Sequence, residues 1–100
     1  MKRYFTRITA DHWVAKNRLA EEAKQLALKM ERLIIHEDTL QSYRDAFVQS
    51  VKELNDKYPR CKPLKPSVWK IPDNRSHIER WSFSIPSVFD IEVVELQGEM

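Results

Sequence analysis

The stretch YPRCKPLKPSVWKIP, residues 58–72, divides the chain into two halves of different character. It contains four prolines, four basic residues and one tryptophan, with neither an acid nor a glycine. Proline fixes φ, lacks an amide donor and keeps the residue before it out of the helical region, so the stretch cannot lie inside a helix. It predicts an extended, polyproline-like segment, here called the proline-rich strip, over residues 59–76.

The half before the strip has the pattern of a helix. Residues 1–58 contain neither glycine nor proline, the two residues that most often interrupt one. From Leu19 to Tyr58, apolar residues recur at alternating spacings of four and three. With Thr9 or Asp11 as the N-cap, this pattern predicts helix over residues 11–58.

Two architectures are compatible with this helical part. A turn near residues 36–39, where four polar residues follow one another, would give an antiparallel hairpin of helices at 11–36 and 39–57. An unbroken helix would instead form a rod of roughly 70 Å, which needs a partner to cover its apolar stripe. The absence of glycine at the turn favours the rod, and the polar cluster and the small chain favour the hairpin. We expect the hairpin, and a homodimer through the same stripe stays open.

The half after the strip has the pattern of strands. RWSFSIPSVFDIEVVEL, residues 80–96, alternates apolar with polar residues on both sides of Pro86 and Ser87. This predicts a β-hairpin over residues 77–96. KRYFTRI, residues 2–8, is a candidate third strand, so residues 1–10 are expected to form a short strand or arm. The expected fold is one α+β domain over residues 1–100, mainly helical, with a proline-rich segment and a C-terminal β-hairpin.

Composition and charge exclude several classes of protein. A net charge of +2 is too small to attract nucleic acid or acidic lipid over the whole surface. Cys61 is the single cysteine, which rules out a scaffold built on internal disulfides. We find no apolar run of membrane-spanning length and no signal-peptide pattern, and we therefore expect a cytoplasmic protein that makes no membrane contact.

The residues that could carry catalysis do not form a recognisable site. Cys61 has basic neighbours that favour its thiolate, but no histidine lies at a familiar spacing. The acids and histidine of residues 36–38 are consecutive, so on a helix they point in different directions. Asp90 and Glu92 alternate with apolar residues, which is ordinary strand patterning. We expect a protein without catalytic activity, cofactor or metal.

The strip itself is the predicted binding site for a larger protein. Its prolines limit the entropy lost on docking, its lysines attract, and a tryptophan can fill a pocket in a partner. A basic residue followed by two prolines three positions apart is typical of ligands for polyproline grooves. The residues expected to bind are Arg60, Pro63, Lys65, Pro66, Trp69 and Lys70.

Two alternatives compete with this interpretation. One is a stiff linker that joins the helical half to the strands. The other is a small nucleic-acid-binding regulator that uses the basic and aromatic region 58–81, since cations contact phosphates and rings stack on bases. Its candidate residues are Lys62, Lys65, Lys70, Arg75 and Arg80, with Tyr58, Trp69 and Trp81. The acids of the C-terminal segment and the modest net charge argue against direct contact with nucleic acid.

The combination of features resembles a known group of proteins. The features are a basic start MKRYF at residues 1–5, a long glycine-free helical half, the segment KPLKPSVWKIP at residues 62–72 and an acidic, strand-like end. The whole chain is similar to the small accessory proteins of lambdoid phage early operons, most nearly the anti-RecBCD proteins. This resemblance implies an inhibitor or modulator that binds the host RecBCD nuclease-helicase, so that phage DNA ends survive and recombine. It also implies a host prolyl isomerase that acts on Pro63, Pro66 or Pro72.

Overall fold

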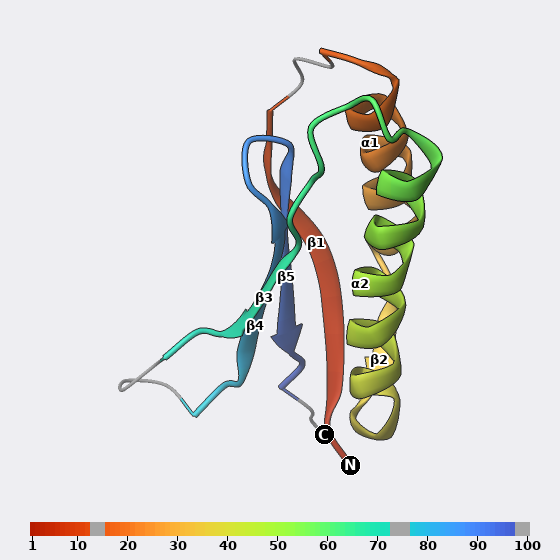
Figure 1. Cartoon of the computed structure of the whole chain (residues 1–100). Helices are drawn as coiled ribbons and strands as arrows, with labels where there is room; N and C mark the ends of the chain where they lie inside the picture. The colour runs from red at the N-terminus through yellow and green to blue at the C-terminus, as the bar shows by residue number, and fades with distance from the viewer. Residues whose placement is uncertain (13–15, 73–76, 98–100) are drawn as a thin grey trace.

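The chain folds as an antiparallel sheet of five strands with two helices packed on one face (Figure 1). The structure, a computed structural model, describes residues 1–12, 16–72 and 77–97. In spatial order the strands are β2 (Ile34–His36), β1 (Arg3–Asp11), β5 (Phe89–Glu95), β4 (Arg80–Ile85) and β3 (Ser67–Lys70). The helices are α1 (Arg18–Met30) and α2 (Leu40–Lys57), and a 3-10 turn, η1 (Glu37–Thr39), precedes α2.

The expected long helical segment over residues 11–58, as hairpin or as rod, is wrong. β1 continues to Asp11, and α1 begins only after Asn17, whose side chain accepts a hydrogen bond from the Ala20 amide at 2.9 Å. α1 then ends at Met30, and β2 separates it from α2. The protein is therefore a sheet with two covering helices, and it is not mainly helical.

Thr6, in the middle of β1, explains why α1 ends where it does. Its buried hydroxyl donates to the Met30 carbonyl at 2.8 Å and accepts from the Leu33 amide at 2.9 Å. Its backbone carbonyl accepts from Arg32 at 2.7 Å, and its amide donates to Leu33 at 3.1 Å. Polar groups at a helix end need partners, and here a strand supplies them. Arg32 adopts a φ of 59°, which turns the chain back toward the sheet.

The apolar spacing that predicted one long helix describes two separate ones. Ala23 and Met30 of α1, and Phe47 and Val51 of α2, are all buried, so the spacing is correct within each helix. Leu33, between them, is 39% exposed. The same apolar spacing continues across β2, where the chain is not helical. Periodicity alone cannot detect a tertiary interaction such as that of Thr6, so the pattern did not show where α1 ends.

The core lies between the helices and one face of the sheet. Phe47 of α2 contacts Phe83 and Phe89 edge to face, with ring centroids 5.5 and 6.2 Å apart. Alanines on α1, among them Ala23 and Ala27, are buried and bring that helix close to its neighbours. Each fully buried aromatic or aliphatic side chain contributes about 1.5–3 kcal/mol relative to exposure.

The strands expected from the sequence are present, and one is longer than expected. β4 and β5 pair over the predicted hairpin, and the Val88 amide donates to the Ile85 carbonyl at 2.9 Å across the turn. Ser87 in that turn has a φ of 69°. The N-terminal candidate strand is β1, which lies between β2 and β5 inside the sheet.

The strip is only partly the polyproline-like connector that the sequence predicts. Residues 67–70 form β3, the last strand of the sheet, paired with β4. The Ile71 amide continues this ladder by donating to the Arg80 carbonyl at 2.9 Å. Backbone groups of an antiparallel strand alternate in direction, so the amides of Val68 and Lys70 point away from β4.

The prolines of the strip fit this alternation. Pro66 and Pro72 occupy positions whose amides would also point outward, so neither removes a bond of the ladder with β4. The outer edge of β3 therefore offers two amide donors between two prolines. Prolines and lysines at an exposed edge limit unspecific pairing with other strands, and this edge has both.

Thr6→Val tests the interaction that ends α1. Valine has the same shape but no hydroxyl, so it leaves the partly buried Leu33 amide without its acceptor. We expect the free energy of unfolding to fall by about 1–3 kcal/mol in urea denaturation. Thr6→Ser retains the hydroxyl and should lose less. If the serine variant is the weaker one, packing of the methyl group matters more than the hydrogen bonds.

Proline substitutions test the direction of the amides in the strip. Ile71→Pro removes a bond to β4, whereas Lys70→Pro removes an amide that faces outward. Relative to Ile71→Ala and Lys70→Ala, which correct for the lost side chains, we expect proline at 71 to cost about 1–3 kcal/mol of unfolding free energy. Proline at 70 should cost clearly less. Equal costs at the two positions would contradict the alternation.

Candidate binding surface

The structure divides the six predicted binding residues among three places. Arg60 is exposed in the turn after α2. Pro63 and Lys65 line a cleft at the end of the molecule near the β4–β5 turn. Pro66, Trp69 and Lys70 belong to β3 or its start. The prediction of one continuous binding strip therefore becomes one of separate surfaces on a folded domain.

Trp69 lies on the face of the sheet that the helices leave uncovered, here called the open face. Its register places it in a row with Ser82, Glu92 and Arg7 across four strands, and 49% of its surface is exposed. In Figure 1 both helices lie on the opposite side of the sheet. An exposed indole on a fixed strand can enter a partner's pocket without first becoming ordered.

A second row of the open face is mostly apolar. Phe5, Val94 and Ile34 are neighbours across β1, β5 and β2, and Ile34 is 51% exposed. The sequence analysis did not identify these residues as a surface. The alternation within each strand was visible, but which face the helices would cover was not.

Three charged residues of the open face, Arg7, Arg80 and Glu92, are paired with one another. Arg7 and Arg80 donate to the two carboxylate oxygens of Glu92 at 3.1 and 2.8 Å. Burial tends to raise the pKa of Glu92, but the hydrogen bonds from Arg80 and Arg7 outweigh it and hold the pKa below its usual value. Glu92 is thus occupied by two arginines, consistent with the expectation that Asp90 and Glu92 are ordinary strand residues.

Glu79 connects the far end of the strip to the N-terminal strand. Its carboxylate accepts from Trp81 Nε1 at 2.6 Å, Lys2 Nζ at 3.0 Å and the Tyr4 hydroxyl at 3.1 Å. Lys70 Nζ lies 3.9 Å away. Burial acts to raise the pKa of Glu79, yet the hydrogen bonds from Trp81, Lys2 and Tyr4 keep it below the ordinary 4.5. Burial also raises the pKa of the Tyr4 hydroxyl, which therefore stays a donor.

Asn55 fixes the middle of the strip to α2. Its amide nitrogen donates to the Leu64 carbonyl at 2.8 Å, and its side-chain oxygen accepts from the Leu64 amide at 2.8 Å. Leu64 itself packs against the core cluster. Because both backbone groups of Leu64 are held, the strip between α2 and β3 is part of the folded domain and not a loose linker.

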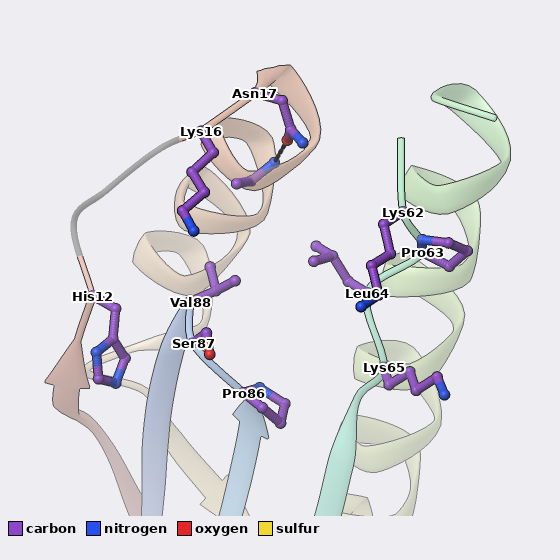
Figure 2. A pocket seen from close by; sticks show the side chains of 11 residues that line it. His12, Lys16, Asn17, Lys62, Pro63, Leu64, Lys65, Pro86, Ser87 and Val88 are labelled. Atoms are coloured by element: carbon purple, nitrogen blue, oxygen red, sulfur yellow. Dashed lines mark hydrogen bonds between the residues drawn. The ribbon is translucent and has the colours of Figure 1, made fainter. Parts of the chain in front are cut away.

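Figure 2 shows the cleft, which lies between the start of α1, the β4–β5 turn and the strip. Its volume is about 660 Å³. His12 and Lys16 reach it from the segment before α1, and Lys62, Pro63, Leu64 and Lys65 reach it from the strip. The sequence analysis assigned no role to His12 or Lys16. No local spacing relates them to residues about fifty positions later, so only the fold could bring the two groups together.

The residues considered for catalysis lie in different parts of the fold: Cys61 after α2, residues 36–38 at β2 and η1, and Asp90 and Glu92 in β5. Cys61 is a free, half-buried thiol in the turn after α2. Over residues 1–12, 16–72 and 77–97, no group of three or more His, Cys, Asp or Glu side chains is placed to hold a metal ion. In the same ranges, neither helix combines the length and the apolar character needed to cross a membrane.

The cations proposed for nucleic-acid binding are dispersed. Lys62 and Lys65 line the cleft, whereas Lys70 lies beside Glu79 and Arg80 donates to Glu92. Arg75 lies outside the described residues. A continuous basic track along the strip is therefore not formed by the cations that the structure places.

Comparisons with known protein families, with curated proteins and with solved structures find no match to this chain.

The lowered pKa of Glu79 predicts a pH-dependent stability. A carboxyl group with a folded pKa below its unfolded value stabilises the fold at pH above the unfolded pKa, near 4.5. This stabilisation is lost as the pH falls through the folded pKa. We expect the free energy of unfolding to decline below about pH 4.5, and less steeply in Glu79→Gln, as measured by urea denaturation at several pH values.

Glu53→Gln provides the control, because Glu53 is exposed on α2 and its loss should leave the acid slope unchanged. A Glu79→Gln variant with the slope of the wild type would show that Glu79 does not carry the effect.

Proposed function

We propose that this protein is a non-catalytic binding protein that docks on a larger protein assembly and modulates it. The observation that carries the proposal is the position of Trp69, half exposed on the outermost strand and on the open face of the sheet. Large aromatic side chains of this kind supply much of the binding energy at protein interfaces.

The surroundings of Trp69 support a protein partner. Beside its row runs the apolar row of Phe5, Val94 and Ile34, and the intervening charges of Arg7 and Glu92 are already paired. Burying such a surface removes apolar area from water without leaving an isolated charge. A face built in this way suits another protein better than a polyanion.

The edge of β3 supports a specific mode of contact. The outward amides of Val68 and Lys70 can donate hydrogen bonds to a short strand of the partner. Pro66 and Pro72 limit how long that strand can be. Strand addition gives affinity through backbone hydrogen bonds, and adjacent side chains give specificity. Trp69 lies between the two outward amides and would provide that specificity.

The sequence resemblance suggests which partner to test first. It selects the host RecBCD nuclease-helicase as the candidate assembly, with inhibition or altered activity as the effect. A host prolyl isomerase is a proposed second partner, for which Pro63 and Pro72 are exposed and Pro66 is half-buried.

Trp69→Ala tests the proposal. Removing the indole should weaken binding to purified RecBCD by ~2 kcal/mol or more, about a thirtyfold increase in Kd. Binding would be measured by interferometry and its effect by the nuclease activity of the complex. The unfolding free energy should change little, because the side chain is half exposed.

Val48→Ala is the matched control, since Val48 is 43% exposed and belongs to α2, which lies on the other side of the sheet from the open face. Equal binding by wild type and Trp69→Ala would contradict the assignment of Trp69. Steep loss of binding between low and moderate salt, with DNA competing, would favour a nucleic-acid-binding function instead.

A further inference from the structure

The cleft is lined by basic and apolar side chains. Its basic members are His12, Lys16, Lys62 and Lys65, and none of the described residues that line it is acidic. No described acid forms an ion pair with any of the three lysines, whereas Lys2, Lys57 and Lys70 each have a carboxylate within 4 Å. Three lysines are therefore gathered around this cleft without an ion-pair partner among the described residues.

Figure 2 shows how the basic side chains lie. Lys16 extends from the start of α1 into the space above Val88, and Lys62 lines the cleft from the strip on the other side. The amino group of Lys65 points away from it. Lys16 and Lys62 thus form two opposite walls, and they come from segments that are far apart in the sequence.

The rest of the cleft is apolar. Leu64 comes from the strip, and Pro86 and Val88 come from the β4–β5 turn. Leu64 is held by Asn55 at both of its backbone groups, and the Val88 amide is bonded across its turn. The apolar part is therefore fixed in position before any ligand arrives, which lowers the cost of binding.

The start of α1 adds to the positive potential. Asn17 satisfies the amide of Ala20 and lines the cleft, as the dashed bond in Figure 2 shows. The amides of Arg18 and Leu19 precede the first bond within the helix. The positive end of the helix dipole therefore reinforces the lysines.

We propose that this cleft binds an acidic peptide segment that carries one apolar side chain. The carboxylates would lie between Lys16 and Lys62, and the apolar side chain would contact Leu64, Pro86 and Val88. A volume of about 660 Å³ matches a few side chains of a peptide. Among the described lining residues His12 is the one with an aromatic ring, so the platform of stacking rings that single-stranded nucleic acid uses is not formed by them.

The site is separate from the surface of Trp69 in the proposed function. The strip connects the two, because Leu64 and Lys65 belong to the cleft and Trp69 lies a few residues further on. One partner chain with an acidic segment next to a strand could occupy both. The inference rests on the charge and shape of the cleft alone and does not require that function.

A titration with a synthetic peptide tests the inference. The probe is an acetylated peptide of glutamates with a single central leucine, added to ¹⁵N-labelled protein and followed by NMR. We expect shifts at the amides of residues 16–20, 62, 64, 65, 87 and 88, since residues 63 and 86 are prolines without an amide proton. The double variant Lys16→Glu and Lys62→Glu should weaken binding at least about tenfold, because two attractions become repulsions.

Matched variants and probes make the result specific. The double variant Arg44→Glu and Lys52→Glu introduces the same charge change at two exposed positions of α2 and should leave the affinity unchanged. A peptide with glutamine in place of glutamate, or with glycine in place of leucine, should bind more weakly. Trp69→Ala should bind the peptide like the wild type, so failure of the Trp69 surface would not be confused with failure of the cleft.

Three results would overturn the inference. One is the absence of peptide-induced shifts around the cleft. Another is an equal loss of affinity in the α2 double variant Arg44→Glu and Lys52→Glu and in the cleft double variant, which would indicate unspecific attraction by net charge. The third is tighter binding of a single-stranded oligonucleotide than of the acidic peptide to the same amides, which would assign the cleft to nucleic acid.

Discussion

The hydroxyl of Thr6, buried in the middle of β1, holds together the parts of the molecule that the rest depends on. It bonds to the last turn of α1 and to the start of the segment that leads into β2. Without this contact, the polar groups at the end of the helix would face an apolar core with fewer partners. Strand β1 thus fixes the residue at which α1 ends. The chain reverses there, and the sheet gains its edge strand β2. The position of α2 over the sheet follows from that reversal.

At the opposite edge of the sheet, two prolines flank strand β3. Pro66 and Pro72 occupy positions where a missing amide does not weaken the pairing of β3 with β4. The strip is held at Leu64 by Asn55 and at Ile71 by the bond from its amide to Arg80. The strip, which could have been a mere connector, therefore forms strand β3 and one wall of the cleft, and it fixes the backbone of Trp69.

Local patterns in the sequence identified local structure well. The alternation around residues 80–96 predicted β4, β5 and their turn, and KRYFTRI predicted most of β1. The failure over residues 11–58 has a tertiary cause. Thr6 ends α1 from a distant part of the chain, and the β-branched Ile34 and Ile35 pair with β1, although the apolar spacing continues from Leu33 to Leu40 across them. The binding role of Trp69 stays a prediction. The open face and the cleft depend on which elements meet, and no short motif encodes that.

The double hydrogen bond between Asn55 and Leu64 also determines how the protein can respond to a partner. A segment whose centre is fixed to a helix moves with that helix as one body, and displacing it would break two partly buried hydrogen bonds. Residues 64–71 of the strip therefore have their shape and charge in the isolated chain, before any partner is present. A partner would have to fit that shape, because the strip could not adjust without losing those bonds.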